Sequence, residues 1–146
     1  MIVLCDTGVL LRFLEPSDPL HVEARRAVSV LTGQGAHLVM ALQNAVEFWS
    51  VCTRPKSARQ GLGLSVAGTD QRMTRLDGMF SMLVDLPPIR TIWRQLVVRH
   101  GVMGRQVHDA KLVALMLAHG IDTILTFNGP DFSRFPGINA IDPRTV

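Results

Sequence analysis

Short runs of apolar residues alternate with longer amphipathic stretches along the chain, and this pattern predicts an α/β protein. Residues 1–5 form an apolar run without polar alternation, which is typical of a strand buried on both faces of a sheet. Further short apolar runs predict strands at 37–40, 84–86, 123–126 and 139–142. Short strands that alternate with helices favour a parallel sheet covered by helices on both sides.

Apolar residues at helical spacing predict six helices between these strands. The first begins at Thr7 and ends before Pro16, and glycines end the second. The helix at 105–119 is apolar almost all round after Lys111, which predicts a central, buried helix. The predicted helices span residues 7–14, 19–32, 42–52, 65–82, 89–100 and 105–119. Helices and strands together predict a three-layer α/β/α sandwich with a small, mostly parallel sheet.

Size and composition favour one folded domain over residues 1–146. The chain is long enough to bury a core, and a composition of 47% apolar and 18% charged residues excludes a disordered protein. No apolar stretch approaches the roughly 18 residues that a membrane span needs, and the apolar start is too short for a signal peptide. We therefore expect a cytoplasmic protein.

Cysteine and arginine usage narrow the chemistry only slightly. Cys5 and Cys52 lie in apolar surroundings, far apart in the sequence, which predicts buried thiols and no disulfide framework or zinc site. Of the 15 basic residues, 13 are arginine, whose planar fork suits phosphate groups. A GC-rich genome would produce the same bias, so the charge by itself does not identify a nucleic-acid-binding protein.

Asp6 follows the first predicted strand as part of Asp-Thr-Gly, and this triplet has two interpretations. Small aspartic proteases carry one Asp-Thr-Gly per chain, but their site lies in an all-β fold. The helical pattern directly after Asp6 favours the other interpretation, a carboxylate at the carboxyl end of a parallel strand. Ligands of open α/β sheets bind at this edge.

Three further acids are expected near the same edge. Asp131 lies just beyond the strand at 123–126, Asp109 occupies the first turn of the buried helix, and the strand at 37–40 leads into the helix that carries Glu47. Each also has an ordinary explanation, as a turn residue, an acid favoured by the helix dipole and a solvated surface residue, respectively. Grouped carboxylates repel one another unless a cation lies among them. Because the five histidines are scattered, Mg²⁺ or Mn²⁺ fits this donor set better than zinc.

Four motifs in this order resemble the PIN-domain ribonucleases, and more closely the VapC-type toxins of bacterial toxin–antitoxin pairs. They are an apolar strand followed by Asp6-Thr7, N-A-V-E-F around Glu47, V-H-D-A-K-L around Asp109, and T-F-N-G-P-D-F around Asp131. Gly8 departs from the family, which more often has Asn or Ser there. Asn128 stands where many relatives have an acid, which leaves Asp131 as the fourth carboxylate.

The resemblance implies a PIN-like fold and metal-dependent hydrolysis of RNA phosphodiester bonds. In that case Asp6, Asp109 and Asp131 would hold one or two Mg²⁺ or Mn²⁺ ions, with Glu47 bound directly or through water. Thr7, Thr126 and Asn128 would support these four catalytic acids. The resemblance also implies an antitoxin that covers the site, and a homodimer. A housekeeping RNA-processing nuclease and a non-catalytic binding module of the same fold stay as alternatives.

Cations outside the acidic pocket are the candidates for phosphate contacts. The basic loop after the third helix and the first helix supply four such residues: Arg12, Arg54, Lys56 and Arg59. A basic loop retained for solubility is the alternative. With few aromatic residues and no tyrosine, the chain offers little for base stacking, so RNA recognition would depend on backbone and shape.

Overall fold

The computed structural model describes residues 1–146, and at its centre lies a five-stranded sheet in the order β3-β2-β1-β4-β5. All four strand pairings are parallel, which confirms the predicted sheet. The strands are β1 (Ile2–Cys5), β2 (His37–Ala41), β3 (Ser81–Leu83), β4 (Thr123–Leu125) and β5 (Asn139–Ile141). The first strand pairs with both β2 and β4, so residues that follow it lie at the middle of the sheet.

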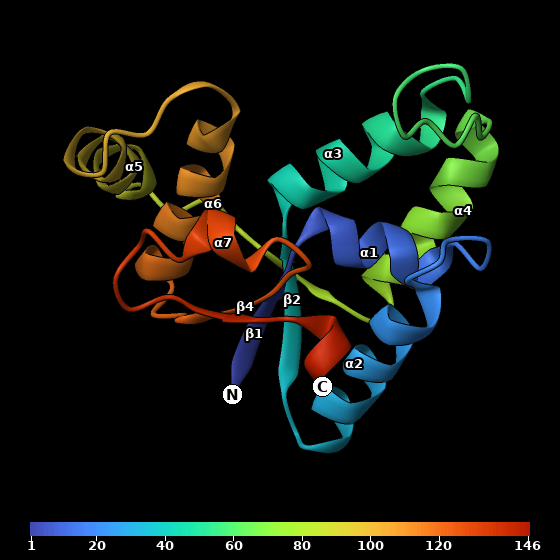
Figure 1. The fold of residues 1–146 in the computed structure, drawn as a ribbon, viewed down its shortest axis with the longest axis horizontal. Coiled ribbons are helices and arrows are strands. Elements are labelled where there is room, and N and C mark those ends of the chain that lie inside the picture. Colours follow the sequence, from blue (N-terminus) through green and yellow to red (C-terminus); the bar gives the residue numbers. More distant parts are fainter.

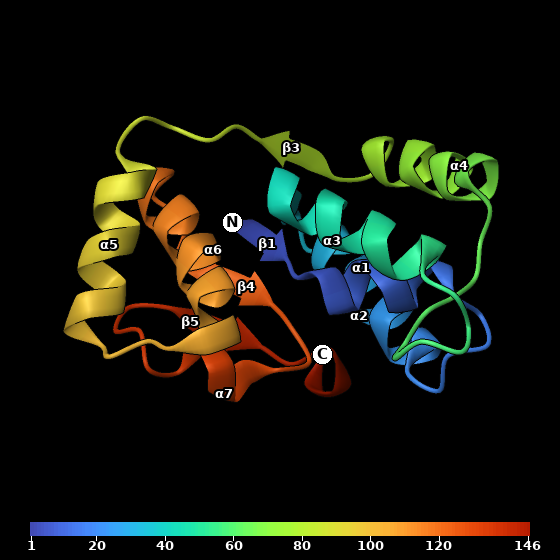
Figure 2. The ribbon, with the colours of Figure 1, turned by 90° about the horizontal axis from the view of Figure 1, so that it is seen from above.

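Helices cover both faces of this sheet (Figures 1 and 2). The α-helices are α1 (Thr7–Leu14), α2 (His21–Gly33), α3 (Leu42–Thr53), α4 (Val66–Asp77), α5 (Ile89–Arg99), α6 (Val107–Ala118) and α7 (Gly129–Phe132), and the 3-10 helices are η1 (Gly104–Gln106) and η2 (Pro143–Thr145). Apolar residues of α1 to α4 pack in one cluster with the sheet, and those of α5 to α7 in another. The predicted three-layer sandwich is therefore confirmed.

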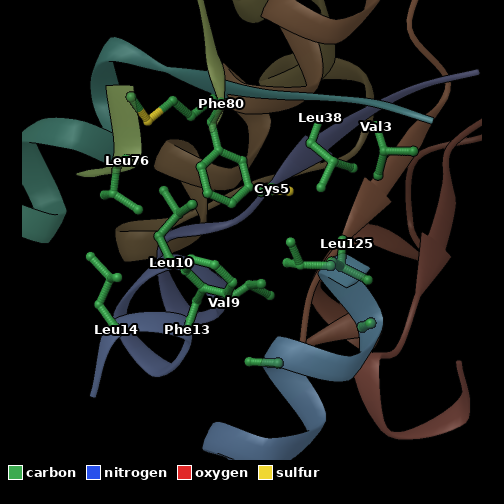
Figure 3. Close-up of a cluster of buried hydrophobic side chains, with 14 of the residues drawn as sticks. Val3, Cys5, Val9, Leu10, Phe13, Leu14, Leu38, Leu76, Phe80 and Leu125 are labelled. Carbon is green, nitrogen blue, oxygen red and sulfur yellow. The ribbon is translucent and has the colours of Figure 1, made fainter. Parts of the chain in front are cut away.

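Successive residues of the inner strands supply these two clusters in turn. Val3 and Cys5 point into the cluster beneath α1 and α2, whereas Leu4 between them points into the cluster beneath α6. Figure 3 shows the first cluster, where the rings of Phe13 and Phe80 meet edge to face with centroids 5.7 Å apart. Because side chains on a strand alternate between its faces, a strand buried on both sides must be apolar throughout.

The predicted helix at 65–82 is too long. The helix α4 ends at Asp77, where Gly78 caps it, and the chain then enters β3 at Ser81, so the strand predicted at 84–86 is also displaced. Met79, which the longer helix would include, is 53% exposed. The apolar run after Gly78 fits the helical period, but its pairing with β2 makes it a strand.

Both cysteines are buried free thiols, as predicted. Burial raises the pKa of Cys52 to about 11 and that of Cys5 further, so neither is a reactive thiolate at neutral pH. The parallel sheet also excludes the aspartic-protease interpretation, which requires an all-β fold. None of the helices combines the length and apolarity that crossing a membrane requires.

Candidate active site

Asp6 lies where the central strand β1 ends and α1 begins. Its backbone N–H donates to the carbonyl of Leu125 at 3.0 Å, so the ends of β1 and β4 are held side by side. The starts of α1 and α3 and the short helix α7 gather at this edge of the sheet (Figure 1). The edge predicted to carry the chemistry is therefore surrounded by helix starts.

Two threonines fix the carboxylate of Asp6. The Thr126 hydroxyl donates to Asp6 Oδ2 at 2.8 Å, and the Thr7 backbone N–H donates to Oδ1 at 2.8 Å. Burial raises the pKa of Asp6, the two hydrogen bonds oppose that rise, and the charges of Glu47 and Asp131 add to it. The Asp6 side chain thus caps α1 and also faces other acids.

Glu47 points into this cluster and is not a solvated residue of a polar stripe. The Thr7 hydroxyl donates to Glu47 Oε2 at 2.7 Å, and Gln43 Nε2 donates to Oε1 at 3.0 Å. The same Gln43 nitrogen lies 3.0 Å from the carbonyl oxygen of His108, which ties α3 to the first turn of α6. Both oxygens of Glu47 are therefore held in place by residues of the protein.

Asn44 is a site residue that the sequence interpretation missed. It is completely buried, its Nδ2 donates to Thr7 Oγ1 at 3.1 Å, and its Oδ1 accepts from the Ala41 N–H at 2.9 Å. The apolar Leu42 and Val46 of this helix are instead 56% and 61% exposed. The sequence did contain a signal for this role. Asn44 lies three residues after Ala41, the residue that precedes the helix, and an amide at this position can accept the N–H of that residue.

Asp109 occupies the first turn of α6, and the charges of the three other predicted acids act on it. Burial, followed by the charges of Asp131, Asp6 and Glu47, raises its pKa to about 7, while the charge of Arg134 opposes the rise. Two carboxylates shift each other's pKa noticeably only when they lie close together. The charges of the four predicted acids therefore act on one another from the end of β1 (Asp6), the interior of α3 (Glu47), the first turn of α6 (Asp109) and α7 (Asp131).

Asp131 lies in α7, where a simple turn was predicted at 128–130. Its backbone N–H donates to the Asn128 carbonyl at 3.0 Å, which forms the first turn of this short helix. Asn128 contributes to the network through its backbone N–H, which donates to Thr126 Oγ1 at 3.0 Å, whereas its side chain is exposed. The Asn128 amide is thus free to contact a ligand or water.

The four predicted phosphate-binding cations differ in how many contacts they already make within the protein. The Arg12 guanidinium donates to the Gly8 carbonyl at 3.1 Å, lies 3.4 Å from Asp18, and stacks over Phe127. Arg54 directly follows the C-terminal end of α3, away from Glu47. It donates to the Arg59 carbonyl and to the Ser50 hydroxyl. Lys56 and Arg59 are exposed and form no ion pair.

Gly8, the departure from the family motif, lies against the side chain of Arg12. A Cβ at Gly8 would lie 3.1 Å from Nη1 of Arg12, so a side chain there would require the guanidinium to shift slightly. The arginine that the sequence placed one helix turn after Asp6 is therefore used inside the protein.

Arg134 is a second site residue that the sequence interpretation missed. Its guanidinium donates a 2.6 Å hydrogen bond to Gln106 Oε1, just before α6, and its charge lowers the pKa of Asp109. It forms no ion pair with an acid. A partly buried arginine that acts on Asp109 and has no acidic partner of its own provides donors for a phosphate group.

The donor set fits a hard divalent cation. It consists of carboxylate oxygens alone, without histidine or cysteine ligands, and such ligands suit Mg²⁺ and Mn²⁺. The raised pKa values of Asp6 and Asp109 reflect burial first and the charges of the neighbouring carboxylates second. As these side chains stand, no three His, Cys, Asp or Glu residues surround one point closely enough to enclose an ion.

Comparisons with known proteins agree with this architecture. The PIN domain family matches residues 3–138. A chain of VapBC2 from Rickettsia felis bound to promoter DNA has a TM-score of 0.70 at 13% identity, covering 97% of this chain and 98% of its own. VapBC-1 from nontypeable Haemophilus influenzae gives 0.70 at 14% identity, covering 98% of both chains. Mycobacterium tuberculosis VapC20, described as a sarcin-ricin loop cleaving toxin, gives 0.65 at 16%, covering 92% of this chain and 95% of its own. No curated protein matches the sequence.

Proposed function

The chain belongs to the PIN domain family, and from this premise we propose that its single domain, residues 1–146, is a metal-dependent endoribonuclease and the toxin of a toxin–antitoxin pair. One observation carries the proposal. Burial, together with the charges of Asp131, Asp6 and Glu47 at the carboxyl edge of the sheet, raises the pKa of Asp109 to about 7. The fold shared with VapC20 and the VapBC proteins supports the toxin assignment.

In this proposal Asp6, Asp109 and Asp131 hold one or two Mg²⁺ or Mn²⁺ ions, and Glu47 binds directly or through water. Such an ion, when bound, lowers the pKa of a water molecule and neutralises charge on the leaving oxygen. Thr126 orients Asp6, while Thr7 and Gln43 hold the two oxygens of Glu47. The water oxygen would form a new bond to phosphorus, the bond from phosphorus to the leaving ribose oxygen would break, and that oxygen would take up a proton, which cuts the strand.

Cations around the acids bind the substrate's phosphates. Arg134 is the first candidate, because its charge acts directly on Asp109. Lys56 and Arg59 on the exposed loop add longer-range contacts, and Arg54 and Arg12 join them only if they leave their present partners. Each phosphate contact adds a salt-dependent contribution to affinity.

An antitoxin protein and a second copy of the chain are the proposed partners. A similar structure described as a toxin–antitoxin complex from Klebsiella pneumoniae supports the first. A processing nuclease of the same fold would cleave RNA without such a partner. A non-catalytic module would bind its partner equally well with or without metal.

A cleavage assay tests the proposal. Purified protein with Mg²⁺ should cut RNA, EDTA should stop the reaction, and Asp109→Asn should lose cleavage while keeping its melting temperature or raising it. The fold should survive because the substitution removes like-charge repulsion and no core contact. A purified Asp109→Asn variant that cuts at the wild-type rate would show that the acids do not perform the chemistry.

A further inference from the structure

The outer face of α5 is a basic surface remote from the acidic site. Its apolar residues pack toward α6, and its opposite side is exposed along the whole helix. Both ribbon views place α5 at the outer end of the molecule, next to α6 (Figures 1 and 2). Six residues on this side line a shallow hollow of about 670 Å³, and we call them the α5 face: Arg90, Thr91, Arg94, Gln95, Val98 and Arg99.

The three arginines of the α5 face have no acidic partner. None of the four ion pairs in the structure includes them, and Asp85, which lies near Arg90, is paired with Lys111 at 3.5 Å. Arg90 and Arg94 are one helical turn apart, where like charges repel. Because the formal charge of the whole chain is only +3, this face concentrates positive charge that no contact within the chain neutralises.

We propose that the α5 face binds backbone phosphates of a folded RNA substrate, away from the bond that is cut. This inference rests on the proposed ribonuclease function and identifies the substrate class as RNA large enough to reach from α5 to the acids. Arginine forks match phosphate oxygens in a bidentate way. Thr91 and Gln95 add neutral donors of the kind that contact phosphate and ribose.

The composition of the α5 face favours RNA over an acidic protein. Only Val98 is apolar among the six residues. Protein interfaces have an apolar or aromatic centre that is depleted of charge, and this face has the reverse arrangement. A polyanion held mainly by its phosphates needs no such centre, because counterion release supplies its affinity.

The α5 face and the acids are held on one rigid support. Trp93, on the inner side of α5, donates its Nε1–H to the Val107 carbonyl at 3.0 Å. That carbonyl belongs to the first residue of α6, two positions before Asp109. The segment 100–106 joins the end of α5 to the same point, so an RNA bound at Arg99 extends toward the start of α6 (Figure 2).

The test compares two RNA substrates and two surfaces. The double variant Arg90→Glu/Arg94→Glu is measured against Arg75→Glu, an exposed arginine on α4 at the opposite end of the molecule (Figure 2). Folded stem-loop RNA should show a KM roughly tenfold higher for the double variant, and the slope of log KM against log salt should fall by about two. Wild type and Arg75→Glu should agree, and a single-stranded oligonucleotide of a few nucleotides should be cut alike by all three.

The results separate this proposal from the proposed function. Equilibrium binding of the stem-loop in EDTA tests the α5 face even if the wild type cuts nothing, an outcome that would defeat the nuclease proposal alone. Equal stem-loop affinity for wild type and double variant would overturn the role of the α5 face. So would a rise in KM for the short oligonucleotide as large as the rise for the stem-loop. Unchanged RNA affinity with lost binding to polyglutamate would assign the face to an acidic protein instead. Far-UV circular dichroism checks that α5 is intact.

Discussion

Thr126 donates a 2.8 Å hydrogen bond to Asp6, although 120 positions separate the two residues. The same hydroxyl oxygen accepts a hydrogen bond from the N–H of Asn128. The hydroxyl therefore accepts one hydrogen bond and donates its only hydrogen to the carboxylate. Thr126 is completely buried, and this bond opposes the rise that burial imposes on the pKa of Asp6. The end of β4 therefore orients Asp6 and favours its charged form against the effect of burial.

Thr126→Val tests this relationship with a side chain of the same shape. We expect the Mg²⁺ concentration for half-maximal cleavage to rise roughly 10- to 100-fold, the usual effect of losing a hydrogen bond behind a metal ligand. The unfolding free energy should also fall by about 1–3 kcal/mol, because Asp6 and the Asn128 N–H each lose a buried partner. Mg²⁺ titration of the cleavage rate measures the first effect. Thr126→Ser should restore it, and an unchanged Mg²⁺ requirement in Thr126→Val would contradict the role.

Asn44→Ala should be the most destabilising substitution in the polar network. The change removes two buried hydrogen bonds, to Thr7 Oγ1 and from the Ala41 N–H, and leaves a cavity next to α1. We expect a loss of about 2–3 kcal/mol in the free energy of unfolding. Urea denaturation measures it, with Gln71→Ala on the exposed side of α4 as the control. A loss no larger than that of the control would mean that Asn44 does not stabilise the start of α3.

The stability of the protein in EDTA should rise as the pH falls from 8.5 to 5.5. Folding raises the pKa of Asp109 from its ordinary value of 3.8 to about 7, so the folded state binds its proton more tightly than the unfolded state. The resulting stabilisation is complete at low pH and is lost as the pH rises through about 7. Burial raises the pKa of Asp6 too, which acts in the same direction.

Melting temperatures across this pH range measure the effect, and Asp109→Asn should flatten much of the profile. Mg²⁺ should raise the melting temperature more at pH 8 than at pH 6, since protons compete with the ion for the same oxygens. A melting temperature that climbs with pH in EDTA would show that the acids are not crowded as described.

The sheet and the edge that carries the acids could be predicted because they follow from local patterns. Residues 1–5 are apolar on both faces, Asp6 directly follows β1, and Asp131 lies in the short segment after β4, so parallel topology brings them to one edge. Glu47 needed more, because its orientation depends on how α3 packs against α1.

The missed features depend on contacts between distant segments. Helical period could not tell which of Leu42 and Asn44 would be buried, since the amide is stable inside only where Thr7 and Ala41 provide partners. Arg134 lies outside every motif, and only the packing of the chain after α7 against Gln106 brings it to Asp109. Likewise Gly78, an ordinary helix terminator, shifted the following strand to Ser81–Leu83.

Arg134 should contribute both charge and hydrogen bonds, and two substitutions can separate these contributions. Arg134→Gln removes the positive charge that lowers the pKa of Asp109, so in EDTA the pH dependence of melting should shift to higher pH. The same variant should raise KM for RNA roughly tenfold, the value of one charge-assisted hydrogen bond, with a smaller change in kcat.

Arg134→Lys keeps the charge but not the fork. It should therefore restore the melting profile while leaving KM elevated, because a point charge replaces bidentate donors. Gln106→Ala, which removes the side chain that holds the guanidinium at 2.6 Å, should lie between wild type and Arg134→Gln in KM. If Arg134→Gln changed neither the melting profile nor KM, the arginine would be a structural contact of the loop after α7, and the phosphate would have to be bound by other cations.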